Sequence, residues 1–229
     1  IEYFDSNFDN LYIHEGIKEI AGGTFGAECL GNIIVDENNP YFVVEDGALY
    51  DVNKERLIKY FASNKRTYFE VPETVVKIDD MAFGGAVYLK ELKLNEGLKE
   101  IGDYAFGYTI IKDFKLPSTL ETIGDGAFTM CPMLEEITIP ESVNYIGDDG
   151  LFTYFPLEVY MESTNVTFGE YELFGVVDFI VDCTREEYAE LLIYALEHNF
   201  DDESADRIES TFKDLDTYVA QYKYYCHEG

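Results

Sequence analysis

Apolar and polar positions repeat along the middle of the chain with a period that alternates between 23 and 22 residues. The segments 68–90, 91–112, 113–135 and 136–157 align without gaps in their apolar columns. The columns are Val71, Leu94, Leu116 and Ile139; Ile78, Ile101, Ile123 and Ile146; and Phe83, Phe106, Phe128 and Phe152, the last shifted by one residue. A unit this short cannot bury its apolar face alone, so equivalent residues must stack between neighbouring units. The pattern therefore predicts a solenoid.

Each unit begins with a short alternation of apolar and polar residues, which predicts a strand. In Ile137-Thr138-Ile139 two side chains point inward and one points outward. Stacked strands of this kind form a parallel sheet with about 4.8 Å between rungs. Weaker copies of the unit cover residues 10–31 and 158–177, and Phe179-Ile180-Val181 predicts the start of one more coil.

The repeat resembles the BspA-like, or treponemal-type, leucine-rich repeat. The matching residues are Ile139-Pro140, Ile146-Gly147, Ala127-Phe128, Cys131 and Leu134. Leu94-Asn95 lacks the proline of the pattern, and Asp79 stands where other units have glycine. The resemblance covers about residues 10–183. It implies a leucine-rich-repeat solenoid of the α/β-type repeat class, made mostly of strands and turns, with about seven coils.

An insertion at about residues 36–67 interrupts the repeat. The β-rich run 41–44, the turn Asp46-Gly47 and the return strand 48–50 predict a hairpin or meander that projects from the solenoid. The preceding run Asp36-Glu37-Asn38-Asn39 offers oxygen atoms to calcium but lacks the glycine and distal glutamate of an EF-hand. We interpret it as a turn.

The periodicity changes after residue 183, so we expect a solenoid domain at 1–183 and a helical C-terminal cap at 184–229. Residues 184–187 form a capping box, and Ser204 begins a second predicted helix with a stripe that includes Phe212 and Tyr222. Such a cap would cover the open end of the solenoid, and a partner-binding helix is the alternative. Cys183 and Cys226 flank the two helices, and whether they form a disulfide stays open.

The composition limits the classes of partner. The 46 acidic and 16 basic residues give a net charge of −30, which repels phosphate backbones and argues against nucleic-acid binding. The chain has no apolar run of the roughly 18 residues that a membrane span needs, so we expect no direct membrane insertion. The first ten residues are acidic and lack the apolar core of a signal peptide.

Motifs that carry catalysis are missing from the sequence. No HExxH, GxSxG, P-loop or GxGxxG pattern is present, and none of the four cysteines is in CxxC spacing. We therefore predict a protein that is not an enzyme and that has no cofactor and no metal site.

The outward positions at the strand centres form a candidate protein-binding sheet face. Its residues are Tyr12, Glu70, Lys93, Lys115, Thr138 and Tyr160, and Ile34 and Ile180 extend the same row. Lys93 and Lys115 are expected to stack about 4.8 Å apart, with Glu91 and Asp113 neutralising them. A solvated face without a ligand is the alternative interpretation.

The resemblance implies a non-enzymatic binding module of a bacterial cell-surface or secreted protein that mediates protein–protein or host-surface adhesion. The expected partner is a protein, such as host extracellular matrix, or a glycan. A structural spacer and a carbohydrate-binding or enzyme-accessory domain are the alternatives. The ligand, the mode of surface anchoring, the oligomeric state and whether the chain is part of a longer protein stay open.

Overall fold

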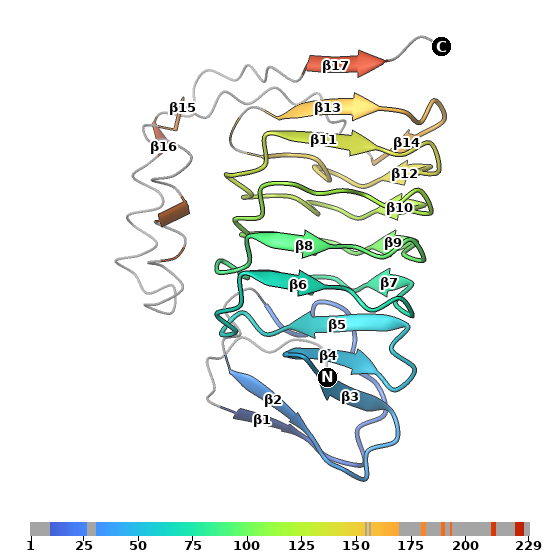
Figure 1. Cartoon of the computed structure of the whole chain (residues 1–229), viewed down its shortest axis with the longest axis vertical. Coiled ribbons are helices and arrows are strands. Elements are labelled where there is room, and N and C mark those ends of the chain that lie inside the picture. Colours follow the sequence, from blue (N-terminus) through green and yellow to red (C-terminus); the bar gives the residue numbers. More distant parts are fainter. Residues whose placement is uncertain are drawn as a thin grey trace.

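The chain forms a β-solenoid of about seven turns in a computed structural model (Figure 1). The structure describes residues 10–26, 31–153, 155, 157–169, 180–181, 189–190, 193, 212–213 and 223–226. Successive coils stack along one axis, and each described coil passes its chain from a front face to a back face. The predicted solenoid of the leucine-rich-repeat type is confirmed for this part of the chain.

The front face carries the strands that the repeat predicts, and we call it the front sheet. Its strands are β6 (Tyr68–Glu70), β8 (Glu91–Lys93), β11 (Glu136–Ile139), β13 (Glu158–Met161) and β17 (Lys223–Cys226). β6 pairs with β8, and β11, β13 and β17 pair in that order, all in parallel. The central residue of β6 and of β8 is buried and its two neighbours are exposed, as the alternation predicts.

The back face is one continuous sheet of short strands. From the last described coil inward, its parallel strands are β14 (Thr167–Phe168), β12 (Tyr145–Ile146), β10 (Thr122–Ile123), β9 (Glu100–Ile101) and β7 (Lys77–Ile78). The sheet continues into β5 (Arg56–Tyr60), β4 (Ala48–Asp51) and β3 (Phe42–Glu45). The first two coils contribute a separate parallel pair, β1 (Asn10–Ile13) and β2 (Asn32–Val35).

The segment predicted as a projecting insertion is part of the solenoid. The hairpin at Asp46-Gly47 is confirmed, because β3 and β4 pair antiparallel on either side of it. However, β5 then pairs in parallel with β7, which aligns Leu57 with Ile78 and extends the isoleucine column by one coil. The prediction that the hairpin projects is therefore wrong. Packing of its apolar residues against the next coil holds it in the stack.

The loop before this hairpin is a turn, as predicted. One carboxylate oxygen of Asp36 accepts hydrogen bonds from the backbone and side-chain nitrogens of Asn38, at 2.8 and 3.2 Å. The backbone hydrogen bond to Asn38 is the main cause that lowers the pKa of Asp36. Asn39 is buried, donates to the carbonyls of His14 and Ile17, and thereby fixes the loop to the first coil.

Stacked aromatic rings fill the centre of the core. Tyr60, Phe83, Phe106 and Phe128 come from successive coils, and neighbouring ring centroids lie 5.3, 5.3 and 5.4 Å apart. All four side chains are completely buried. The next place in this column is taken by Leu151, which is buried, whereas Phe152 is only partly buried. In the fourth repeat the column was expected to contain Phe152, and it contains the preceding residue, Leu151.

The glycine and aspartate that follow the isoleucine column link one coil to the next. A carboxylate oxygen of Asp103 accepts a hydrogen bond from the backbone N–H of Asp125 at 2.9 Å, and Asp125 does the same for Asp148 at 2.8 Å. A Cβ atom at Gly124 would lie 2.5 Å from the Asp103 carboxylate oxygen and 2.6 Å from its backbone nitrogen. The close approach of the coils therefore requires glycine at this position.

The two departures from the repeat have structural causes. Asp79, which replaces the glycine, is 1% exposed and forms an ion pair with Arg56 of β5. Burial is the main cause that raises the pKa of Asp79, against the opposing effect of Arg56. Asn95, which replaces the proline, donates from its amide to the carbonyls of Pro72 and Val75 at 2.8 and 3.0 Å. Both side chains bind the preceding coils.

The predicted helical cap is not supported. Phe212–Lys213 (β16) and Lys223–Cys226 (β17) are strands within the range of the second predicted helix. β16 pairs antiparallel with β15 (Ile180–Val181), and β17 extends the front sheet at β13. In the described part of the chain, the open edge of β13 is paired by the strand β17. In the first predicted helix, residues 189, 190 and 193 are helical and the rest lies outside the described residues.

Replacing Gly124 by alanine tests the coil spacing. We expect the free energy of unfolding to fall by about 2 kcal/mol, because the new methyl group would overlap the backbone of the preceding coil. Gly16→Ala is the control, since a Cβ there would meet its nearest neighbour, His14, at an ordinary 3.4 Å. Urea unfolding followed by circular dichroism gives both values. Equal stability of the two variants would contradict the spacing argument.

Replacing Tyr60 by phenylalanine tests the first ring of the stack. The Tyr60 hydroxyl is buried and has no hydrogen-bond partner among the described residues. Because an unpaired buried hydroxyl is costly, we expect Tyr60→Phe to keep or raise the free energy of unfolding, by up to about 1 kcal/mol. The reverse change on the neighbouring ring, Phe83→Tyr, should lower it. A clear loss in Tyr60→Phe would show that the hydroxyl has a partner.

Candidate functional site

The strands that carry residues of the candidate face belong to separate sheets. Glu70 and Lys93 lie opposite each other on β6 and β8, and Thr138 and Tyr160 lie opposite each other on β11 and β13. Tyr12 lies on β1, which belongs to a separate sheet, and its side chain is 71% exposed. The predicted row is therefore not carried by one continuous sheet.

The expected stack of Lys93 on Lys115 rests on a strand pairing that is not formed. No ladder joins β8 to residues 113–116 in the described structure. Lys93 instead forms an ion pair with Glu70 of the preceding coil, with 2.5 Å between Nζ and Oε1. This hydrogen bond lowers the pKa of Glu70 and raises that of Lys93. Glu70, and not Glu91 or Asp113, neutralises Lys93.

The far end of the row also differs from the prediction. Ile180 lies on β15, which pairs with β16, so it does not continue the front sheet. β17 takes that place beside β13. The Tyr160 hydroxyl donates to a carboxylate oxygen of Glu158 at 3.0 Å.

The front sheet is interrupted where the third aligned repeat begins. Residues 113–116 make a single β-bridge, from Phe114 to Ile137 of β11. The preceding coil returns to the front by a path one residue shorter than its neighbours: five positions separate Phe106 from Ile111, whereas six separate Phe83 from Leu89. The interruption thus coincides with a local shortening of the repeat.

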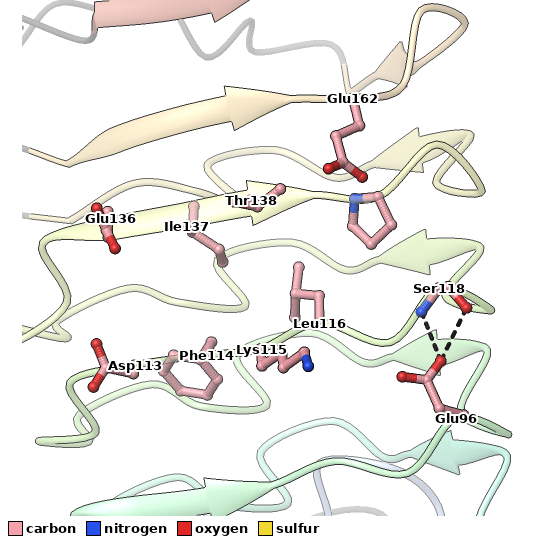
Figure 2. Close-up of a pocket in the computed structure, with 11 residues that line it drawn as sticks. Glu96, Asp113, Phe114, Lys115, Leu116, Ser118, Glu136, Ile137, Thr138 and Glu162 are labelled. Carbon is pink, nitrogen blue, oxygen red and sulfur yellow. Dashed lines mark hydrogen bonds between the residues drawn. The ribbon is translucent and has the colours of Figure 1, made fainter.

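A hollow of about 460 Å³ lies at this interruption (Figure 2). Buried apolar side chains form part of its lining, and acidic side chains surround them. The lining residues are Glu96, Asp113, Phe114, Lys115, Leu116, Ser118, Glu136, Ile137, Thr138, Pro140 and Glu162. Two residues of the candidate face, Lys115 and Thr138, are among them.

The carboxylates stand around the hollow at its corners. Figure 2 shows Asp113 and Glu136 toward one end, Glu96 and Glu162 toward the other, and Lys115 and Thr138 between them. Glu96 is held in place because one of its oxygens accepts hydrogen bonds from the N–H and the hydroxyl of Ser118, at 3.0 and 2.9 Å. The site is an acidic rim above an apolar floor.

Sequence reasoning proposed Lys115 and Thr138, which line the hollow, but did not predict the hollow itself. Glu96 and Glu162 lie in the turns after the strands, outside the row of outward positions, so their approach to Lys115 depends on the spacing of several coils. The available signal was the shorter return path between Phe106 and Ile111.

Groups that carry other chemistry do not gather at this site. Among the described residues, no cluster of histidine, cysteine or acidic side chains is placed to hold a metal ion, and no helix is long and apolar enough to cross a membrane. Cys131 is buried, its thiol donates to the carbonyl of Phe106 at 3.1 Å, and burial raises its pKa to about 11. The possible disulfide between Cys183 and Cys226 involves a residue, Cys183, that lies outside the described residues.

Several solved structures, including the following two, are similar to this fold. The pneumococcal vaccine antigen PcpA shares 21% identity with a TM-score of 0.54, over 72% of this chain and 56% of that chain. A leucine rich cell surface protein from Faecalibacterium prausnitzii A2-165 shares 23% identity with a TM-score of 0.59, over 72% of this chain and 48% of that chain. The chain thus spans about half the length of these structures. No curated protein matches the sequence.

The repeats themselves match a known family. Six copies of the BspA type leucine rich repeat region cover residues 58–175, just over half of the chain. The match begins within β5, in agreement with the structural finding that this strand belongs to the stack. The chain therefore belongs to the BspA-type leucine-rich-repeat family.

Proposed function

We propose that the chain is a non-enzymatic module that binds another protein on its front sheet, at the surface of a bacterium or after secretion. The hollow around Lys115 and Thr138 is the observation that carries the proposal. Leucine-rich-repeat proteins generally bind other proteins and are generally not enzymes. One structural neighbour is described as a vaccine antigen and another as a cell surface protein, which supports the location.

The dimensions of the hollow suit anchoring side chains of a partner. Its volume of about 460 Å³ is within the range of ordinary binding pockets, roughly 300–1,000 Å³. Phe114, Leu116 and Ile137 offer an apolar floor within the front face. Interfaces draw most of their affinity from a few side chains buried in such pockets, and the surrounding contacts exclude water.

The other residues of the candidate face then lie around this centre. Glu70 and Lys93 neutralise each other on the neighbouring coils, and Tyr160 adjoins Thr138 on β13. We therefore propose Lys115 and Thr138 as the centre of the binding surface, with Glu70, Lys93 and Tyr160 at its periphery. Tyr12, on its own sheet, is a separate exposed residue.

Filling the hollow tests the proposal. The chain is screened at physiological salt against immobilised host extracellular-matrix proteins and a glycan array. We expect a protein to bind, and Thr138→Tyr to weaken its affinity at least tenfold, because the phenol would occupy the hollow. Thr167→Tyr, at an exposed position of β14 on the back sheet, is the matched control and should bind as before. Surface plasmon resonance measures both.

The remaining outcomes separate the alternatives. A ligand found on the glycan array alone would favour a carbohydrate-binding or accessory domain. No binding in either screen would favour a structural spacer. Protein binding that Thr138→Tyr leaves unchanged would place the binding surface elsewhere on the chain.

A further inference from the structure

We propose that the hollow receives a basic side chain, arginine or lysine, from the bound protein. This inference rests on the proposed function, because it names the chemistry of the partner at the same surface. It follows from the charges of the rim, from the state of Lys115 and from the shape of the apolar floor.

The carboxylates of the rim outnumber the positively charged groups that line the hollow. Four carboxylates, those of Glu96, Asp113, Glu136 and Glu162, face one ammonium group among the described residues that line the hollow, a net charge of −3. None of the four forms an ion pair with a described lysine or arginine. A cationic group placed between them would be attracted from both ends of the hollow.

Lys115 does not fulfil this role itself. Within the described structure no carboxylate oxygen lies within 4.0 Å of its ammonium group, in contrast to Lys77, Lys93 and Lys99. Each of these three lysines pairs with a glutamate of an adjacent coil, at 2.5 to 3.0 Å. The coil-to-coil pairing that balances charge elsewhere on the surface is thus missing at Lys115.

A row of like charges strengthens the field at one end of the hollow. Glu91, Asp113, Glu136 and Glu158 lie at equivalent positions in successive coils, and all four are exposed. Glu136 and Glu158 lie directly opposite each other on β11 and β13. Like charges at directly opposite positions repel each other, so a cation from outside would relieve the repulsion.

The floor selects long side chains with an aliphatic stem. Arginine and lysine place their methylene groups on apolar surface while the charged group reaches polar partners. Phe114, Leu116 and Pro140 would contact the stem, and the rim carboxylates would accept hydrogen bonds from the charged end. An acidic side chain would meet the same floor but would be repelled by the rim and by the net charge of −30.

A short peptide with one charged residue tests this preference. The probe is acetyl-Gly-Ser-Arg-Ser-Gly-amide, compared with the same peptide carrying citrulline, which keeps the shape without the charge, or glutamate. Titration of the ¹⁵N-labelled chain, followed by amide shifts at Lys115 and Thr138, measures the dissociation constants. We expect citrulline to weaken binding at least tenfold and glutamate to abolish it.

Charge variants locate the effect. Asp113→Asn with Glu136→Gln should weaken binding of the arginine peptide at least tenfold. Glu15→Gln with Glu19→Gln removes the same charge from an exposed segment of the first coil and should leave binding unchanged. Equal weakening by both double variants would show attraction by overall charge and overturn the proposal. Equal binding of the arginine and citrulline peptides, or no binding of either, would overturn it as well.

The two proposals fail in different ways. If a matrix protein binds and Thr138→Tyr blocks it, but the peptides show no charge preference, the binding module stands and the basic anchor is wrong. If the arginine peptide shifts Lys115 and Thr138 while no protein binds in the screen, the charge preference stands and the proposed function is wrong.

Discussion

The stacking of buried rings from one coil to the next is the interaction on which the rest of the fold depends. Tyr60, Phe83, Phe106 and Phe128 contact each other at centroid distances of 5.3 to 5.4 Å. Each ring is buried only because its neighbours cover both faces, so no coil is stable without the next. Tyr60 lies on β5 and extends this column by one coil, so β5 joins the solenoid although the sequence around it departs from the repeat.

The ring column in turn constrains the surface. Coils this close leave no room for a side chain at Gly124, and they bring equivalent surface residues of neighbouring coils next to each other. With only 16 basic residues against 46 acidic ones, charge balance between coils depends on where the lysines fall. Lys77, Lys93 and Lys99 each pair with a glutamate of an adjacent coil. These exposed pairs contribute little to stability, but they neutralise the surface around them.

The repeat could be predicted from the sequence because its columns depend on local spacing alone. The isoleucine column, the ring column up to Phe128 and the turn at Asp46-Gly47 are all confirmed. The helical cap is not supported and the projecting hairpin is wrong, because both segments are arranged by long-range pairing. Helical spacing around Phe212 and Tyr222 predicted a helix, yet the open edge of β13 pairs with a strand from the same region. A strand edge that requires a partner overrides local propensity.

The candidate site illustrates the same limit on a smaller scale. An uninterrupted repeat would pair 113–116 with β8, whereas this segment makes only the bridge from Phe114 to Ile137, beside which the hollow lies. The return path between Phe106 and Ile111 is one residue shorter, the ladder stops at this point, and Lys115 is left among carboxylates of several coils. The apolar columns of the core are uninterrupted at this point. The ring of Phe114 still packs against those of Phe106 and Phe128, with 4.8 Å between ring centroids in each pair. The front sheet is thus interrupted at residues 113–116 while the core keeps its register, because the rings of successive coils still pack against one another.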